Sequence, residues 1–527
     1  MLTICEANPS EGSSTAAMPS IAQMMGDMAK AARHAAVITL QKIRFKGGEV
    51  RSRINIENQR QLKASGFSAG TRFTVTYSVG MVEIAVSNQG TNVISPKFFP
   101  KRDGSDEIGE RLDLRSLQIH ENFAGQERIL ALYLENRVVF VHLPTVARGL
   151  SRVEQLLDAV KRKSLRTAAL YAGIGTLDAA LHEGFEKAGL NAQMCFANEI
   201  LEEATNAMLN DNPAASHKTK TFNGGIEQYL ASGIDIGTPD LCALGIPCKG
   251  TSKLNVATRD LPEMHPWAGH QVINAVLALQ KMNFPPLVLV ENVTAYADTV
   301  SLSMLRRVLE EQGYQTHLIG DVDGEGKYKG INSSDYSDIE RRIRMALLAF
   351  PSGIQLNLAM VKSGPSKLTV GDIRVPEHLV DAEEYEKGLH LNSEEKLAKG
   401  WKNRIVSDDA NITPTLSSDC WKQRVEDPKF KHPTNPAKCR LPLPEEHAAL
   451  KGHSPQLIRS LGNSQAHSAL GNGTAKKCWV ELARALGVAL QDANTVMHVY
   501  VRKFKESLQF AYAATCSVDG EPELSLF

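Results

Sequence analysis

The stretch ALGIPCKGTSKLN, from Ala243 to Asn255, places a cysteine directly after a proline and ahead of a polar run rich in Gly, Ser, Thr and Lys. The thiolate is the nucleophilic form of cysteine, and the nearby charges of Lys249 and Lys253 would stabilise it. A phosphate backbone could also dock on such a loop. Most single cysteines are instead small buried hydrophobic residues. The neighbours of Cys248 favour a nucleophile at the end of an apolar strand.

A carboxyl group and two arginines complete this candidate chemistry. The later segment PPLVLVENV is apolar until Glu291 and Asn292, and in a doubly wound sheet its end lies beside the Cys248 loop. A partly desolvated carboxyl there could stay protonated and donate a proton, although it could also merely cap the next helix. In SDIERRIRMALLAF, Arg342 and Arg344 share one face of an expected strand, either holding an anionic substrate or simply charging the start of the strand.

A glycine turn and an acid suggest a nucleotide-like cofactor. The segment LYAGIGTLDAALHEGF places Gly173 and Gly175 between a strand and a helix, where a ligand can approach the backbone. Glu199 ends the next strand, at the position where an acid commonly accepts hydrogen bonds from ribose hydroxyls. A tight strand-to-helix turn explains the glycines equally well, but the two features together indicate an adenosine-containing cofactor.

Alternating strands and helices must position these residues. From Thr167, apolar runs that predict buried strands alternate with helical stretches, which predicts an α/β domain with a doubly wound, parallel sheet. The apolar runs are TAALYA, AQMCFANE, DLCALGIP, PLVLVENV, YQTHLIGD and RMALLAF, with a short extra strand expected around TKTFNG. Periodicity is lost between Pro351 and Pro436 and returns afterwards as helix, so this block reads as an insert in one catalytic unit.

The rest of the sequence predicts further domains and a linker helix. With 527 residues, two or three domains are expected. Hairpins are predicted around Val79-Gly80 and Glu135-Asn136, and an amphipathic helix follows them. The expected boundaries are a disordered leader over 1–35, a small β-rich domain over 36–145, a linker helix over 146–165, a cofactor-binding catalytic domain over 166–350, a recognition region over 351–436, a return to the catalytic domain over 437–490 and a C-terminal extension over 491–527.

The amino-acid composition indicates the class of protein and its cellular location. Hydrophobic residues make up 43% and charged residues 22%, the net charge is zero, and no apolar run approaches the roughly 20 residues of a membrane span. Eight cysteines without a Cys-x-x-Cys pair or a His-Cys cluster at zinc spacing argue against a disulfide framework and against a metal site. We therefore expect a cytoplasmic protein with no membrane partner.

Taken in order, these residues resemble the motifs of the cytosine-5 DNA methyltransferases from about Thr167 to Gly487. The matching segments are LYAGIG, NEI, NGGI, GIPCKGTS, ENV, ERRIR, and RLPLPEEHAALKGH followed by ALGNGTAKKCWVELARAL. The resemblance implies S-adenosylmethionine as cofactor, held by Tyr171, Gly173, Gly175, Glu199, Ile226 and Asn472. It implies catalysis by Cys248, Glu291, Arg342 and Arg344. It implies substrate contacts from Pro247, Ser252 and Asn292.

The implied reaction explains the exposed thiol. Cys248 would attack C6 of a cytosine flipped out of duplex DNA, Glu291 would protonate N3, and Arg342 would support the base and the acid. The activated C5 would then accept the methyl group. The recognition region over 351–436 would read the DNA.

The chain also departs from the family pattern. Gly225 stands where an Asp usually precedes the isoleucine, Ile200 replaces an aromatic residue, Lys249 and Thr251 replace Gln and Phe, and Glu340 replaces Gln. These positions lie near the cofactor or the base, so an altered donor, base or target context would follow from them.

Three interpretations stay open. The first is a DNA methyltransferase acting on double-stranded DNA, with a restriction endonuclease as a possible partner. The second is an RNA cytosine methyltransferase. The third is a DNA-binding regulator, because the segment INIENQRQLKASGFSAGTRFTVTYSVGMVEIAV resembles the small β-domain of AbrB-like and SymE-like proteins.

Overall fold

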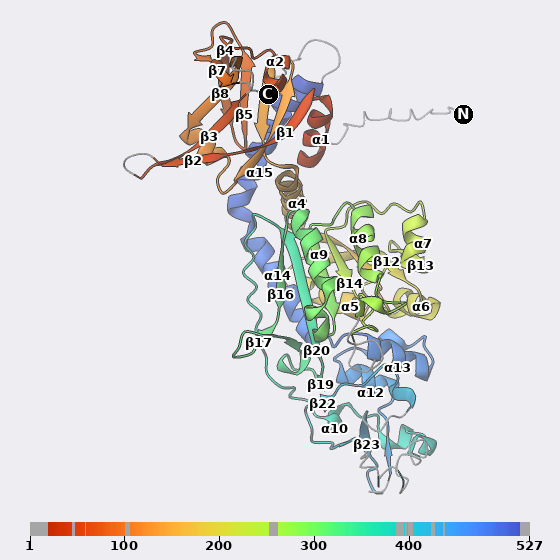
Figure 1. The fold of residues 1–527 in the computed structure, drawn as a ribbon. Helices are drawn as coiled ribbons and strands as arrows, with labels where there is room; N and C mark the ends of the chain where they lie inside the picture. The colour runs from red at the N-terminus through yellow and green to blue at the C-terminus, as the bar shows by residue number, and fades with distance from the viewer. Residues whose placement is uncertain are drawn as a thin grey trace, which may run out of the picture. The chain divides into compact units, whose positions relative to one another are not determined.

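The structure is a computed structural model that describes residues 19–44, 48–57, 60–100, 106–251, 262–385, 395, 398, 404–422, 427–435 and 438–516. The chain forms two compact units (Figure 1). The first comprises Met1–Ser151 with Tyr500–Phe527, and the second comprises Arg152–Val499. Among the described residues, no helix combines the length and the apolar character needed to cross a bilayer.

The first unit is β-rich, as the sequence predicts for 36–145. Its six-stranded sheet has the order β1-β9-β10-β5-β4-β6, and a four-stranded sheet has the order β2-β3-β8-β7. The two expected hairpins are confirmed as β4–β5 and β9–β10, with Gly80 and Asn136 at positive φ in their turns. The bounds are β1 His34–Thr39, β2 Gln41–Arg44, β3 Val50–Glu57, β4 Arg72–Ser78, β5 Met81–Val86, β6 Asn92–Val93, β7 Ser95–Pro100, β8 Asp106–Ser116, β9 Arg128–Leu134 and β10 Arg137–Val141, with short helices α2 Arg60–Ala64 and α3 Leu117–Asn122.

The leader expected to be disordered over 1–35 contains a helix, α1 (Ile21–Ala31). Ser20 caps it by accepting a hydrogen bond from the Gln23 amide at 3.2 Å, and its buried residues recur at helical spacing. The buried side chains are Ile21, Met24, Met25 and Met28. The expectation is therefore wrong for this stretch, because the methionines form one apolar face. Residues 1–18 lie outside the described part of the chain.

The segment expected as a C-terminal extension also contributes to the first unit. Helix α15 (Asn494–Cys516) belongs to this unit from Tyr500 onward. The Tyr500 hydroxyl is hydrogen-bonded to His142 Nε2 at 2.7 Å, and the Phe504 ring packs edge-on against His142. Residues widely separated in the sequence therefore complete one core.

The second unit confirms the predicted α/β class. Its sheet has the order β13-β12-β11-β14-β15-β20-β18-β17, with β16 pairing with β20. Strands β11 to β15 pair in parallel, but β20 is antiparallel to both β15 and β16, so the expected all-parallel arrangement is wrong at this edge. The bounds are β11 Ser164–Leu170, β12 Asn191–Glu199, β13 Lys220–Asn223, β14 Leu241–Leu244, β15 Leu287–Asn292, β16 Tyr314–Ile319, β17 Asp321–Val322, β18 Tyr328–Asn332 and β20 Ile343–Pro351.

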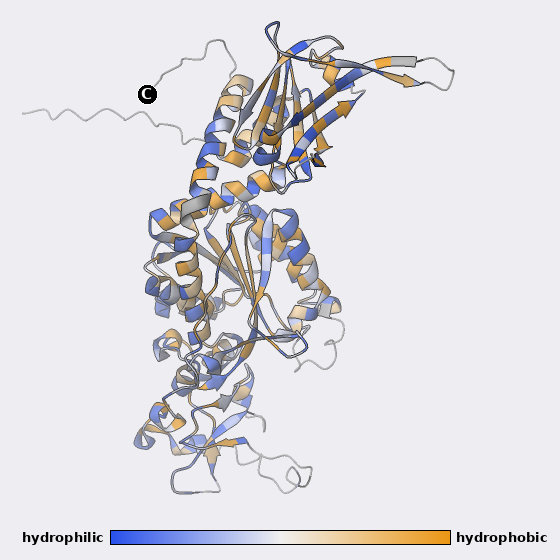
Figure 2. Cartoon of the chain, turned by 90° about the vertical axis from the view of Figure 1, so that its left-hand side faces the viewer, coloured by the Kyte–Doolittle hydropathy of each residue, from blue (hydrophilic) through white to orange (hydrophobic). Residues whose placement is uncertain are grey.

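Helices cover both faces of this sheet. The apolar residues of α7, α8 and α9 share one core with β11, β14, β15 and β20. Helix α14 packs against α5 so closely that a side chain at Gly184 would collide with the backbone of Val480. Figure 2 shows hydrophobic and hydrophilic residues alternating along these helices. The helices are α4 Pro144–Lys161, α5 Thr176–Lys187, α6 Glu202–Asp211, α7 Ile226–Ala231, α8 Gln271–Lys281, α9 Val300–Glu311, α10 Val370–Ile373, α12 Pro444–Leu450, α13 Asn463–Asn472 and α14 Lys477–Asp492.

The region between the sheet and the final helices has small sheets of its own. Strand β19 pairs in parallel with β22, and a three-stranded sheet has the order β21-β23-β24. The bounds are β19 Glu340–Arg341, β21 Arg404–Val406, β22 Thr413–Pro414, β23 Pro428–Lys431 and β24 Cys439–Arg440. The pairing of β19 with β22 joins this region directly to the segment that precedes β20.

The packing of α15 gives a first prediction. Gly80 and Gly125 have φ values of 70° and 78°, so alanine at either position should cost about 1 to 2 kcal/mol of stability. A Cβ at Gly80 would also collide with Phe504 and His142, whereas the space at Gly125 is open. We expect Gly80→Ala to cost a further ~1–3 kcal/mol. Hydrogen exchange of peptides from β4 and β5 measures the difference, and equal effects of the two substitutions would contradict the packing described.

Candidate functional site

The carboxyl ends of adjacent strands bring the predicted residues together. Leu170, at the end of β11, pairs with Asn198 of β12 on one side and with Leu244 of β14 on the other. Leu244 in turn pairs with Val290 of β15. The glycine turn, Glu199, the Cys248 loop and Glu291 therefore all leave the same edge of the sheet, where ligands bind in open α/β folds.

The glycine turn after β11 is locked to Glu199. The Gly173 amide donates to Glu199 Oε2 at 2.7 Å, and the amides of Ile200 and Leu201 donate to Oε1 at 2.9 and 3.0 Å. Gly173 and Gly175 have positive φ, and Gly175 immediately precedes α5. A carboxylate has about four acceptor positions, so Glu199 keeps capacity for hydroxyl donors. The glycine turn and Glu199 therefore lie together, and their predicted cofactor binding stays a prediction.

Tyr171 and a polar group from α7 and α8 flank the turn. The Tyr171 hydroxyl donates to the carbonyl oxygen and to Oε1 of Gln271, at 3.1 and 3.0 Å. Glu227 Oε1 accepts hydrogen bonds from the side chains of Gln271 and Asn274 and contacts His270 Nε2 at 3.1 Å. This group was not predicted from the sequence. The acid two residues after Gly225 was its only signal.

Ile226, expected as a cofactor-binding residue, has its side chain in the core and its backbone at the start of α7. It is 2% exposed and packs in the core with Tyr229 and Phe196. It is the first residue of α7, and Gly225 before it is capped by Gln228 Oε1 at 2.9 Å. The side chain that faces the polar group is that of Glu227.

Asn472 is exposed and lies beside the start of α5. The amide of Thr474 donates to Thr176 Oγ1 at 3.0 Å, and Thr176 follows Gly175 directly. Asn472 therefore ends α13 next to the glycine turn. This position agrees with the one implied by the resemblance.

The backbone around Cys248 forms a fixed turn. The Cys248 carbonyl accepts from the Thr251 amide at 2.9 Å and from Thr251 Oγ1 at 3.1 Å. Asn292 Nδ2 donates to the Ile246 carbonyl at 3.0 Å, and Asn292 is 2% exposed. Asn292 therefore positions the nucleophile loop and is too buried for its expected substrate contact. Pro247 is half-buried, and Ser252 lies outside the described residues.

Arg344 and Glu291 form an ion pair beside the thiol. Arg344 Nε lies 3.0 Å from Glu291 Oε1, with the two side chains 18% and 13% exposed. A charge-assisted contact in such a restricted site fixes both groups. The resemblance implied that Arg342 supports the acid, but the direct partner of Glu291 is Arg344.

Arg342 serves a different purpose. It lies between β19 and β20, two residues before Arg344, and both guanidinium groups lower the pKa of the Cys248 thiol. Its Nη2 donates to the Gly471 carbonyl at 2.8 Å and approaches that of Asn472 at 3.5 Å. Among the described residues, its buried Nε has no hydrogen-bond partner. The guanidinium therefore keeps one donor available close to the site.

At the Cys248 thiol, burial has a larger effect on the pKa than the nearby positive charges have. Burial raises the pKa of Cys248, Arg344 and Arg342 lower it, and Glu291 raises it. Burial therefore outweighs the expected lowering of the thiol pKa, and Lys253, one of the two lysines in that expectation, lies outside the described residues. Burial also raises the pKa of Glu291 against the opposing effects of Arg344, Arg342 and Lys451. The role of Glu291 as a proton donor stays a prediction.

Glu340, one of the departures from the family pattern, has its own buried partner. Its Oε2 lies 2.6 Å from Lys451 Nζ, and both side chains are fully buried. Its Oε1 accepts from the Leu416 amide at 2.8 Å. Burial raises the pKa of Glu340, but Lys451 and Arg342 outweigh it and keep the pKa below its ordinary value. The carboxylate is therefore charged and neutralised by the lysine.

No protein-family model and no curated protein matches this sequence. Among solved structures, the chain is similar to the Entamoeba histolytica methyltransferase EhMeth, with 17% identity and a TM-score of 0.45 over 62% of this chain and 98% of that one. It is similar to the S. pombe Dnmt2 methyltransferase, with 17% identity and a TM-score of 0.44 over 62% of this chain and 98% of that one. It is also similar to a mutant of Spodoptera frugiperda DNMT2, with 14% identity and a TM-score of 0.45 over 61% and 99% of the two chains. These values are too low to transfer residues or substrates from those proteins.

The electrostatics predict the reactivity of the thiol. Glu291→Gln removes the charge that raises the pKa of Cys248 and leaves Arg344 without its anion, so the thiol pKa should fall. Alkylation of Cys248 by iodoacetamide near pH 8, followed by peptide mass spectrometry, should become about three- to tenfold faster, because a lower pKa leaves a larger fraction of the thiol as thiolate. Glu227→Gln is the matched control and should leave the rate unchanged. Slower alkylation after Glu291→Gln would contradict the arrangement.

The buried ion pair predicts an asymmetric response. Lys451→Gln should destabilise the second unit by about 3 to 5 kcal/mol, because it leaves Glu340 buried and uncompensated. Adding Glu340→Gln should recover most of that loss. Urea unfolding followed by tryptophan fluorescence measures both, with Lys422→Gln at an exposed pair as a control expected to cost under about 1 kcal/mol. Equal losses in the single and double variants would show that the two charges are not coupled.

Proposed function

We propose that this chain is a DNA cytosine-5 methyltransferase that uses S-adenosylmethionine. The proposal rests on one observation: a cysteine turn, a carboxyl paired with an arginine, and a glycine turn locked to an acid leave neighbouring strands at one edge of the sheet. Each group occurs by itself in many proteins. Here they follow one another along the chain in the order of the motifs named above. They also share one edge of the sheet.

The cofactor would be held by the turn and the acid. Gly173 and Gly175 leave the backbone open before α5, Glu199 offers acceptors for hydroxyls, and Asn472 lies beside the start of α5. Glu227 is the candidate to replace the missing carboxylate at Gly225, because its side chain is half exposed and accepts N–H donors. When bound, S-adenosylmethionine supplies an electrophilic methyl group.

The chain's own residues would activate the base. C5 of cytosine is a poor nucleophile, and addition of the Cys248 thiolate at C6 with protonation of N3 by Glu291 converts the ring into an enamine. Arg344 holds Glu291 in place and lowers the pKa of the buried thiol. After methylation, loss of the C5 proton and elimination of the Cys248 thiolate restore the aromatic ring and the free enzyme.

Duplex DNA is the proposed substrate, and the region over 351–436 is proposed to read it. An inserted region of this size suits recognition around a flipped base. RNA is the alternative substrate, and a regulator that binds DNA without chemistry is the alternative function. The β-rich first unit would serve for docking or dimerisation, or for DNA binding in the case of a regulator. A restriction endonuclease would be a partner only if the chain is a DNA-modifying enzyme.

Product analysis with a cysteine control tests the proposal. Purified protein incubated with S-adenosylmethionine and mixed duplex DNA should yield 5-methylcytosine by nucleoside mass spectrometry, and Cys248→Ala should abolish it by removing the nucleophile. Cys195→Ala, at another half-buried cysteine, is the matched control and should retain product.

Assays with DNA and with RNA as substrate distinguish the alternative functions. Methylation of RNA alone would replace the DNA assignment, since both substrates use the same chemistry. Tight DNA binding without any modified cytosine, in the wild type as in Cys248→Ala, would overturn the enzymatic assignment in favour of a regulator.

A further inference from the structure

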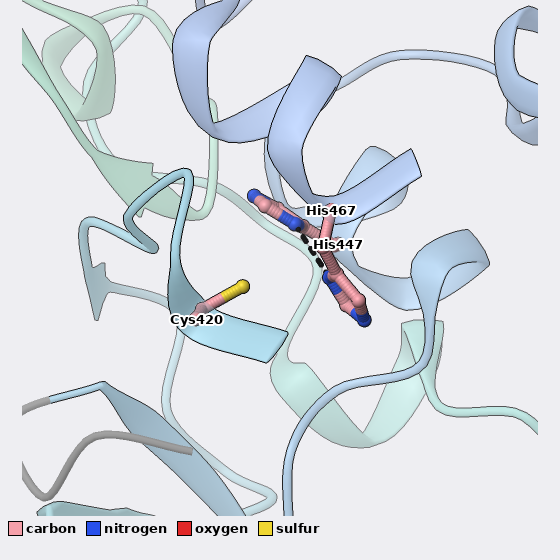
Figure 3. Close-up of side chains that lie close together, drawn as sticks. All are labelled: Cys420, His447 and His467. Carbon is pink, nitrogen blue, oxygen red and sulfur yellow. Dashed lines mark hydrogen bonds between the residues drawn. The ribbon is translucent and has the colours of Figure 1, made fainter. Parts of the chain in front are cut away.

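A buried cluster of two histidines and a cysteine lies outside the catalytic residues. Cys420, His447 and His467 each present a possible ligand atom, and these atoms all lie within 4.8 Å of one another (Figure 3). All three residues are buried. None of them contributes to the cysteine, carboxyl or cofactor positions described above. The cluster therefore calls for an explanation of its own.

The residues come from separate elements. Cys420 begins a short 3-10 helix, η7 (Cys420–Lys422), while His447 lies on α12 and His467 on α13. Helix α13 contacts both the 3-10 helix and α12. No metal site was expected from the sequence, because no His-Cys cluster occurs at zinc spacing. The fold collects ligand types that are far apart in the chain.

The spacing of the two imidazoles suits a metal ion. Their Nδ1 atoms lie 3.1 Å apart. Two nitrogens bound to one tetrahedral zinc ion at about 2.0 to 2.1 Å would lie roughly 3.3 Å apart.

We propose that Cys420, His447 and His467 bind one zinc ion. Two imidazole nitrogens and one thiolate form a borderline-soft donor set that zinc accepts. The cluster contains no fourth His, Cys, Asp or Glu ligand within the part of the chain that the structure describes, so a water molecule completes the tetrahedron. This site does not depend on the proposed methyltransferase activity.

The metal would tie the region before β23 to the catalytic part of the second unit. A side chain at Gly471, on the same helix as His467, would collide with the backbone of Ser417 and Ser418. The Gly471 carbonyl is also the acceptor for Arg342. A zinc ion that links Cys420 to α13 would therefore hold this close contact, and with it the carbonyl that orients Arg342.

Metal content and a cobalt spectrum test the proposal on the full chain. Protein expressed with added zinc and passed over a desalting column should retain about one zinc per chain by inductively coupled plasma mass spectrometry. Replacement by Co²⁺ should give a thiolate-to-cobalt charge-transfer band and the intense visible bands of tetrahedral cobalt. Both readouts are independent of methylation.

Matched variants locate the ion. Cys420→Ser should remove the charge-transfer band and reduce zinc by about tenfold or more, since the loss of even an outer-shell partner of a ligand costs about 10- to 100-fold in affinity. Cys439→Ser, at a buried cysteine of β24, should keep both signals. Wild-type protein with less than about a tenth of an equivalent of zinc and no cobalt band would overturn the proposal. So would equal zinc in the two variants. The wild-type measurements decide the question even if Cys420→Ser does not fold.

Discussion

The antiparallel pairing of β20 with β15 is the constraint on which the candidate site depends. In parallel strands, like ends meet at one edge, so a parallel strand would carry its first residues to the opposite edge of the sheet. Because β20 runs the other way, its first residues lie against the last residues of β15, with Met345 opposite Asn292. Arg344 thereby reaches Glu291, and Arg342 reaches the end of α13. One reversed strand supplies the positive charge to an edge otherwise built from parallel strands.

Buried charge surrounds that edge and is neutralised locally. Glu340 is paired with Lys451, and Arg440 forms two hydrogen bonds with Glu446 at 2.6 and 2.8 Å, with both side chains fully buried. Such pairs contribute little net stability relative to apolar packing, but removing one partner is costly. They therefore specify one arrangement of the segments around Arg342. The charges of Glu340 and Lys451 offset each other. This explains how an acid is tolerated next to a site where an unpaired negative charge would be unfavourable.

Much of this could be predicted from the sequence, and the failures have physical reasons. Apolar runs ending in Glu199, Cys248 and Glu291 predicted both the strands and the common edge, because buried strands and their polar ends are local patterns. The direction of β20 was not predictable from its composition. The partner of Glu291 and the burial of Asn292 depend on which strands are neighbours. The pKa of Cys248 depends mainly on burial, which the presence of Lys249 in the sequence does not reveal. The grouping of Cys420 with His447 and His467 has no local signal at all.

The return of α15 to the first unit has a consequence for how the chain folds during synthesis. The β4–β5 hairpin and His142 are made early, but Tyr500 and Phe504, which cover them, are made only after the whole second unit. Translation at about 5 to 20 residues per second separates the two events by tens of seconds. During that interval the apolar surface beneath α15 is uncovered on the nascent chain. The strands of the first unit are thus made before the second unit but are covered only after it, which makes the first unit a natural substrate for chaperones that bind exposed apolar surface.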